Sequence, residues 1–157
     1  MTDRLRLREW QSGQAETVFG LMGSEETMGD ARTRVYSLAE AQVWLDKRLA
    51  QQREHGMTMW AVERLFDDTF VGACGLFPEP DRLELAYILD HRHWRLGYAT
   101  EAVTAVVAAV REAGEARTIY ATIRPHNLGS IRVAEKVGLN LAEEVTDDRG
   151  ALWVFTL

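Results

Sequence analysis

The stretch Trp94-Arg95-Leu96-Gly97-Tyr98-Ala99-Thr100-Glu101-Ala102 decides how this chain folds and where its chemistry lies. It follows an apolar, strand-like run at residues 83–89 and precedes an Ala/Val-rich helical run at residues 102–113. A glycine among small residues at a strand-to-helix junction lets backbone amides approach a ligand closely. The helix behind the junction adds unpaired N–H groups and a partial positive charge. The stretch therefore predicts a phosphate-binding loop.

The composition indicates one globular domain, residues 1–157. The apolar fraction of 46% and the charged fraction of 27% are ordinary for such a domain. The net charge of −6, from 24 acidic and 18 basic residues, argues against a nucleic-acid partner, because nucleic acids bind cationic surfaces. No run approaches the roughly 18 apolar residues of a membrane span, and the N-terminus lacks the apolar core of a secretion signal. We therefore expect a cytoplasmic protein that does not associate with membranes.

Seven runs of residues have strand patterns and four have helix patterns. A capping box formed by Ser37 and Glu40 begins the second helix. Asn127 and Gly138 are typical first and last signals of the fourth helix, and glycines mark residues 20–37 as a loop. The predicted strands are residues 4–8, 57–65, 69–76, 83–89, 118–123, 139–145 and 151–156, and the predicted helices are residues 15–22, 38–55, 102–113 and 128–137.

Two motifs in this α/β arrangement resemble those of a known family. The loop motif at residues 94–102 and the later run Asn127-Leu128-Gly129-Ser130-Ile131-Arg132-Val133-Ala134-Glu135-Lys136-Val137-Gly138-Leu139 are similar to the two signatures of the GNAT N-acetyltransferases. The opening Arg4-Leu5-Arg6-Leu7-Arg8 and the hairpin that contains Trp60-Ala61-Val62 and Val71-Gly72 resemble the RimJ/RimL-type branch, which acetylates ribosomal-protein N-termini. The resemblance covers nearly the whole chain. It implies an α+β domain with a mixed, mostly antiparallel sheet of about seven strands flanked by about four helices, and a possible homodimer.

The resemblance also implies a binding site for acetyl-CoA. In the family the loop amides hold the CoA pyrophosphate, which agrees with an amide nest that needs small residues more than particular side chains. The strand before the loop splays from its neighbour and pairs with the pantetheine arm, which Asn127 also contacts. The cofactor-binding residues that the resemblance implies are Tyr87, Ile88, Leu89, Arg95, Leu96, Gly97, Tyr98, Ala99, Thr100, Asn127 and Ser130.

Two positions depart from the family pattern. Trp94 stands where the superfamily has Gln or Arg, a change that is typical of the RimJ/RimL-type branch. Ala134 stands where many relatives carry a Tyr that protonates the leaving thiolate. Ser130, three residues after Asn127, is the substitute candidate. It would act through a hydrogen bond to the sulfur or through a relay of water.

Acetyl transfer to an amine requires a proton acceptor and a donor to the carbonyl oxygen. An alkylamine is mostly protonated at pH 7, so a carboxylate or an imidazole must take its proton. Glu84 is the predicted base, because it shares a strand face with Ala86 and Ile88 on the strand that borders the acyl group. The amide near Ile88 is the predicted donor to the oxygen. No metal is required, and the single Cys74 excludes a thiolate-cluster metal site.

Several of these residues also have a purely structural interpretation. Ser130 can be an ordinary residue of a first helical turn. Glu84 can be a solvated strand residue or an ion-pair partner of Arg82. His91 and His93 flank the loop and are further candidate bases, although exposed loop histidines are common.

The sequence leaves two functions open. The first is an acetyl-CoA-dependent N-acetyltransferase that moves an acetyl group to a primary amine, either a protein N-terminus or a small amine, by direct attack on the thioester. Its acceptor pocket would form at the first two helices and the loop between them, where Glu25, Glu26 and Asp30 could attract a cation. The alternative is a non-catalytic acyl-CoA-binding or sensing module, which Ala134 favours. A nucleotide-binding domain is disfavoured, because the loop has one glycine where a dinucleotide fingerprint has three.

Overall fold

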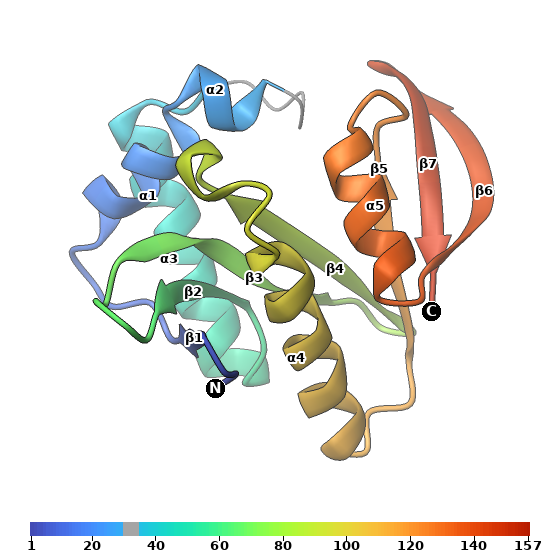
Figure 1. Ribbon diagram of the computed structural model, residues 1–157, viewed down its shortest axis with the longest axis horizontal. Coiled ribbons are helices and arrows are strands. Elements are labelled where there is room, and N and C mark those ends of the chain that lie inside the picture. The colour runs from blue at the N-terminus through green and yellow to red at the C-terminus, as the bar shows by residue number, and fades with distance from the viewer. Residues whose placement is uncertain (30–34) are drawn as a thin grey trace.

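The computed structural model describes residues 1–29 and 35–157 as a central sheet with helices on both faces (Figure 1). The sheet has seven strands in the order β1-β2-β3-β4-β5-β7-β6. All neighbouring pairs are antiparallel except β4 and β5, which run parallel, so the predicted mixed, mostly antiparallel sheet is confirmed. The strands are β1 (Leu5–Arg8), β2 (Met59–Arg64), β3 (Phe70–Pro78), β4 (Arg82–Leu89), β5 (Thr118–Ile123), β6 (Asn140–Asp147) and β7 (Gly150–Thr156).

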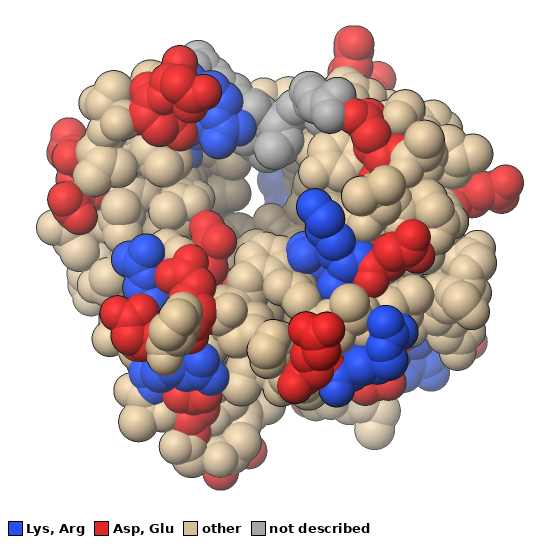
Figure 2. All heavy atoms as spheres, turned by 180° about the vertical axis from the view of Figure 1, so that it is seen from behind, with Lys and Arg blue, Asp and Glu red and all other residues tan. Residues whose placement is uncertain are grey.

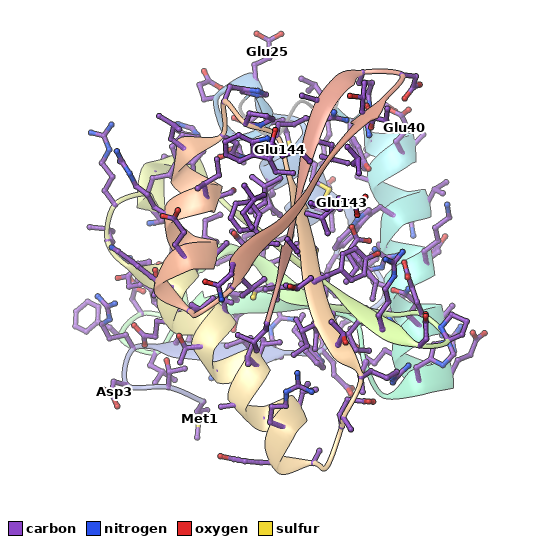
Figure 3. All side chains as sticks on the ribbon, turned by 90° about the vertical axis from the view of Figure 1, so that its right-hand side faces the viewer. Met1, Asp3, Glu25, Glu40, Glu143 and Glu144 are labelled. Carbon is purple, nitrogen blue, oxygen red and sulfur yellow. The ribbon has the colours of Figure 1, made fainter. Side chains whose placement is uncertain are left out.

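The helices divide between the two faces of the sheet. Figure 3 shows α4 and α5 on one side of it and α3 on the other. The predicted capping box is present, because Ser37 Oγ accepts from Glu40 N and the Glu40 carboxylate accepts from Ser37 N. Gly56, at a φ of 62°, ends the same helix. The helices among the described residues are α1 (Ala15–Met22), α2 (Glu25–Met28), α3 (Leu38–His55), α4 (Tyr98–Glu112), α5 (Leu128–Lys136) and the 3₁₀-helix η1 (His91–His93).

Two predicted boundaries were wrong. The predicted loop at residues 20–37 contains the helix α2, whose N-cap Ser24 accepts a hydrogen bond from Thr27 N. One helical turn offers too few positions for a period to be recognised. The helix α4 begins at Tyr98 instead of Ala102, because Gly97 completes the junction at a φ of 82° and the helix follows directly. Asp30, which was expected in the loop, lies outside the described residues.

Apolar side chains fill both faces of the sheet. On the α4 and α5 side the cluster includes Val103 and Phe155, and on the α1 and α3 side it includes Trp10 and Leu45. Cys74 belongs to the first cluster. Burial raises the pKa of the Cys74 thiol, so this cysteine is a core residue without thiolate character.

The strands β4 and β5 are paired over only part of their length. Their register joins Arg82 to Thr118, Leu83 to Ile119 and Glu84 to Tyr120. Beyond Glu84, β4 continues to pair with β3 on one side, while β5 pairs with β7 on the other. The facing edges of the two central strands therefore separate, which is the splay that the resemblance implied.

Candidate functional site

A cavity of about 580 Å³ lies at the opening between β4 and α5. The end of β4, the loop before α4 and the first turns of α4 and α5 line it. Two residues of the predicted site, Leu96 and Glu84, do not line the cavity. The others are brought together around it: Tyr87, Ile88, Leu89, Arg95, Gly97, Tyr98, Ala99, Thr100, Asn127 and Ser130.

The backbone of β4 presents alternate amides to the opening. Asp90 N donates to a carbonyl of β3 at 3.0 Å. Because N–H groups alternate along a strand, Ile88 N–H also points toward β3. The N–H groups of Tyr87 and Leu89 consequently face the opening, and Trp94 Nε1 donates to Leu89 O at 2.6 Å. A donor to a ligand in the opening therefore belongs to a neighbour of Ile88 and not to Ile88 itself.

The loop between β4 and α4 has the backbone geometry of an anion site. Arg95 and Gly97 both have left-handed φ angles, of 63° and 82°. Such residues gather successive N–H groups into a nest that favours negative charge. The helix begins at Tyr98, so the N–H groups of its first turn have no acceptor within the helix and add the positive end of its dipole. Leu96 is 48% exposed, so its side chain is not part of the core.

Arg4, just before β1, braces this loop from the outside. Its Nη1 donates to Leu96 O at 3.0 Å, and its Nη2 lies 2.6 Å from Glu101 Oε2. Its guanidinium also lies 4.8 Å from the centre of the Tyr98 ring. One side chain thus holds both the loop carbonyl and the first turn of α4. The sequence pattern identified Arg4 only as a strand residue.

The start of α5 forms the opposite wall of the cavity. Asn127 Oδ1 accepts a hydrogen bond from Ser130 N at 3.1 Å, so Asn127 is an N-cap as its position predicted. The Tyr87 hydroxyl crosses from β4 and donates to Ser130 O at 2.7 Å. Burial raises the pKa of the Tyr87 phenol. Ala134 is fully buried in the core, so this position contributes no polar group to the cavity.

Glu84 faces the other side of the sheet, toward α3. It is half-buried, and Thr122 Oγ1 donates to its Oε1 at 3.1 Å. Burial raises the pKa of the Glu84 carboxyl, the hydrogen bond from Thr122 lowers it, and the negative charge of Glu79 raises it. Arg82 forms its ion pair with Glu79, at 2.6 Å, and not with Glu84. The ion-pair interpretation of Glu84 is therefore wrong, and its carboxylate stays close to the splay.

Other cavity residues were not singled out from the sequence as parts of a site. Arg132 and Lys136 are exposed on α5 at a spacing of i and i+4, which places both on one helix face, and that spacing was a usable signal. Thr27 of α2 also reaches the cavity, and its hydroxyl lies 3.2 Å from His91 Nδ1. No sequence pattern links residues that lie 64 positions apart.

The flanking histidines differ in their surroundings. His93 lines the cavity, and burial lowers its pKa.

Within residues 1–29 and 35–157, no group of three or more His, Cys, Asp or Glu side chains is placed to hold a metal ion. In the same part of the chain, no helix has both the length and the apolar character needed to cross a membrane.

Comparison with known proteins gives concordant matches. The family model described as an acetyltransferase (GNAT) domain matches residues 4–140. The uncharacterized protein YkkB of Bacillus subtilis (strain 168) is 28% identical over 149 residues, which cover 92% of this chain and 87% of the relative. The RimL ribosomal L7/L12 acetyltransferase in complex with coenzyme A superimposes with a TM-score of 0.87 at 14% identity, covering 99% of this chain and 94% of the other. Spermidine N-acetyltransferase from Vibrio cholerae, solved with CoA and spermine, gives 0.82 at 15% identity, with 98% and 94% covered.

Proposed function

Because this chain belongs to the GNAT acetyltransferases, whose domain model spans residues 4–140, we propose that it transfers an acetyl group from acetyl-CoA to a primary amine by direct attack on the thioester. The acceptor is a small amine or a protein N-terminus. Among the structural neighbours, RimL is described as acting on a ribosomal protein and another as a spermidine acetyltransferase, so one fold supports both kinds of acceptor.

The single observation that carries this proposal is the unpaired edge of β4, which runs directly into an anion-binding loop. The edge offers the N–H groups of Tyr87 and Leu89, and the loop offers the left-handed nest at Arg95 and Gly97 with the N-terminus of α4 behind it. A long ligand with amide groups in its arm and a diphosphate at its end matches this sequence of donors. CoA is such a ligand.

The charges around the cavity fit the same ligand. Arg95, Arg132 and Lys136 are exposed cations that line it, which suits a molecule that carries several phosphate charges. The chemistry that bound acetyl-CoA supplies is an activated acyl group. The chain must stabilise the carbonyl oxygen of that group, accept a proton from the attacking amine and donate a proton to the departing sulfur.

The N–H of Tyr87 is the proposed donor to the carbonyl oxygen. It faces the opening, as does the N–H of Leu89, which lies one strand repeat closer to the loop. Tyr87 also lies nearer to Glu84, the proposed base. A backbone N–H that is fixed by the strand is pre-organised for a developing negative charge.

Glu84 is the proposed proton acceptor for the amine. It lies where β4 and β5 begin to separate and faces α3, opposite to the face that carries α4 and α5. An amine that arrives from the α3 side would meet this carboxylate at the splay. Burial raises the pKa of Glu84, which makes it a stronger base than an exposed carboxylate.

Ser130 is the proposed proton donor to the departing sulfur. Ser130 lies in the first turn of α5 and lines the cavity, and Ala134 offers no polar group in its place. The buried Ala134 also favours the alternative, a protein that binds acyl-CoA without transferring the acyl group. A direct assay decides between these two functions.

The test has two parts. Titration calorimetry with acetyl-CoA, and with ATP and NAD as controls, measures which ligand binds. A thiol-release assay then follows a panel of peptides, polyamines, aminoglycosides and amino acids with the wild-type protein and with Glu84→Gln. We expect acetyl-CoA alone to bind and at least one amine to release thiol, at a rate that Glu84→Gln lowers by roughly 100-fold.

The possible outcomes separate the two functions. Binding of acetyl-CoA without thiol release by any amine would contradict the enzyme and support the sensing module. Binding of ATP or NAD in preference to acetyl-CoA would contradict both. A Glu84→Gln variant that keeps the full rate and an unchanged pH profile would leave the reaction standing but remove Glu84 as its base.

A further inference from the structure

The face of the sheet that carries α3 holds an arginine between two aromatic rings. The Arg48 guanidinium lies 5.1 Å from the Trp44 ring and 4.5 Å from the Phe77 ring. Phe77 is the register partner of Glu84 in the pairing of β3 and β4. Directly opposed residues of a sheet point to the same side, so Arg48 and Glu84 flank one ring on one face. Figure 2 looks onto this face, which is hollowed between two lobes of the molecule.

Arg48 has no anionic partner within the described part of the chain. Its Nε is buried and lies within hydrogen-bonding distance of no acceptor. Gln51 Oε1, one turn further along α3, is likewise buried without a donor. Burial lowers the pKa of Arg48, and a charge interaction with Tyr36 opposes this shift. Arg6 Nε is buried without an acceptor too, but Arg6 Nη2 pairs with Glu63 and Asp68. Arg48 has neither an Nε acceptor nor a carboxylate partner among the described residues, and this combination indicates a position for an anionic ligand.

The environment of Arg48 differs from that of the other partly buried arginines. Arg8 and Arg117 each pair with a carboxylate, Glu63 and Glu115, at 2.7 and 2.5 Å. The aromatic rings beside Arg48 hold the plane of its guanidinium but cannot accept its N–H bonds in the plane. A planar, rigid fork of donors that is held in this way is suited to a carboxylate.

We propose that Arg48 binds a carboxylate of the acetyl acceptor, so that the acceptor is an amine that also carries a carboxylate. This inference rests on the proposed function, because it takes the α3 side as the acceptor side and Glu84 as the base. With Phe77 between them, the two charged groups are on the order of 10 Å apart, given the usual cross-strand spacing. An amino acid, or a peptide N-terminus with an acidic residue beside it, spans such a distance between a base and an arginine.

The experiment compares each acceptor with its uncharged analogue. The probes are the twenty amino acids, the corresponding amino-acid amides, and tetrapeptides with Asp or Glu at the second position against the same peptides with Asn or Gln. Thiol release gives kcat and KM for the wild type and for Arg48→Gln, Arg48→Lys and the control Arg53→Gln, an exposed arginine on the same helix. Thermal unfolding of each variant checks that it folds. Comparison of the free amino acids with the tetrapeptides shows whether the carboxylate belongs to an amino acid or to an acidic side chain of a peptide.

We expect the wild type to prefer one carboxylate over its amide on the order of 100-fold in kcat/KM. Arg48→Gln should abolish that preference, mainly by raising KM for the carboxylate far more than for the amide. Arg48→Lys should retain part of it, and Arg53→Gln should retain all of it. Equal use of carboxylates and amides by the wild type, or an equal loss for both in Arg48→Gln, overturns the inference while acetyl transfer stands.

A second measurement keeps the two proposals apart. Calorimetry of each carboxylate and amide pair, in the presence of CoA, reports acceptor binding without turnover. If no amine releases thiol but a carboxylate binds and Arg48→Gln removes that binding, the acetyltransferase proposal fails and the Arg48 site survives. If no carboxylate binds the wild type more tightly than its amide, the Arg48 inference is wrong whatever the activity.

Discussion

The Tyr87 hydroxyl donates a 2.7 Å hydrogen bond to the carbonyl oxygen of Ser130, and this bond spans the opening between β4 and α5. Over this stretch the two central strands are not paired. The bond therefore fixes the width of the cavity at the point where the unpaired strand edge meets the first turn of α5. It joins Tyr87, whose backbone N–H is the proposed donor to the carbonyl oxygen, to Ser130, whose hydroxyl is the proposed proton donor to the sulfur.

The two partners of this bond can be separated by substitution. Ser130→Ala keeps the bond, because the acceptor is a backbone oxygen, and removes only the hydroxyl that we propose as proton donor. We expect kcat to fall by roughly 100-fold with unchanged resistance to urea. Tyr87→Phe should instead lower the free energy of unfolding by about 1 kcal/mol, because one intramolecular hydrogen bond is lost. Full kcat in Ser130→Ala, measured by thiol release, would remove Ser130 from the chemistry.

The pKa of Glu84 can be moved through Thr122. The Thr122 hydroxyl donates to the Glu84 carboxylate at 3.1 Å and stabilises its charged form, whereas burial raises the pKa of this group. Thr122→Val removes the stabilising bond, so the pKa of Glu84 rises further. If Glu84 is the base, activity is lost as it becomes protonated, and the acid limb of the kcat/KM profile moves to higher pH.

The conservative substitution provides the control for this shift. Thr122→Ser keeps a hydroxyl at the same position, so its acid limb should coincide with that of the wild type. Measurement of kcat/KM from pH 4 to 9 with a saturating donor resolves the three curves. An acid limb that stays in place in Thr122→Val would show that another group controls the profile.

The parts of the fold that sequence analysis predicted are those set by neighbouring residues. Ser37 and Glu40 form a capping box within one turn, and Gly97 supplies a left-handed φ at a strand-to-helix junction. Both signals depend on local backbone geometry, so a single sequence carries them. The same logic located the strand at residues 83–89 and therefore the edge that the cavity exposes.

The parts that were missed depend on contacts between distant segments. Arg4 braces the loop through Glu101, 97 residues away, and Thr27 meets His91 across 64 residues. Nothing in the local pattern around these residues distinguishes them from ordinary surface positions. The sequence also gave no sign of Arg48, because its lack of a hydrogen-bond acceptor depends on the surrounding fold and not on its position in the helix. Such residues become identifiable only when burial and partners are known.

The left-handed glycine of the loop should be necessary for binding of acetyl-CoA. A β-carbon on Gly97 would meet the Arg4 guanidinium at 3.3 Å, and its φ of 82° is strained for any other residue. We expect Gly97→Ala to weaken acetyl-CoA binding at least tenfold, measured by calorimetry. An alanine in the left-handed conformation costs on the order of 1–2 kcal/mol, so the loop should relax away from the geometry of the nest. Gly97→Val should abolish binding.

Gly56 provides a matched control for this prediction. It also has a left-handed φ, of 62°, and a β-carbon there would meet open space, but it ends α3 far along the chain from the loop. Gly56→Ala should lower the melting temperature to a similar extent as Gly97→Ala and leave acetyl-CoA affinity unchanged. Equal affinities for the two alanine variants would contradict the assignment of the loop to the diphosphate.

The turn between β6 and β7 should lose stability in acid through one ion pair. Asp147 accepts from Arg124 at 3.0 and 2.6 Å, and the buried Arg124 also donates to the carbonyls of Gly150 and Ala151. This pairing lowers the pKa of Asp147 to about 2 from an ordinary value of 3.8. A folded-state pKa below the unfolded one stabilises the protein above the unfolded value, and the contribution disappears as the pH falls toward the folded value.

The pH dependence of Asp147→Asn follows from that sign. Removal of the charge leaves Arg124 with two carbonyls and no carboxylate, so the variant should unfold at lower urea concentration than the wild type above pH 4. The difference should narrow as the pH falls from 4 toward 2, because the wild type then loses the same charge. Asp148→Asn, at the exposed neighbouring position, should follow the wild type throughout. If the difference in unfolding urea concentration between Asp147→Asn and the wild type stays constant down to pH 2, the Asp147 side chain stabilises the fold through packing and not through its charge.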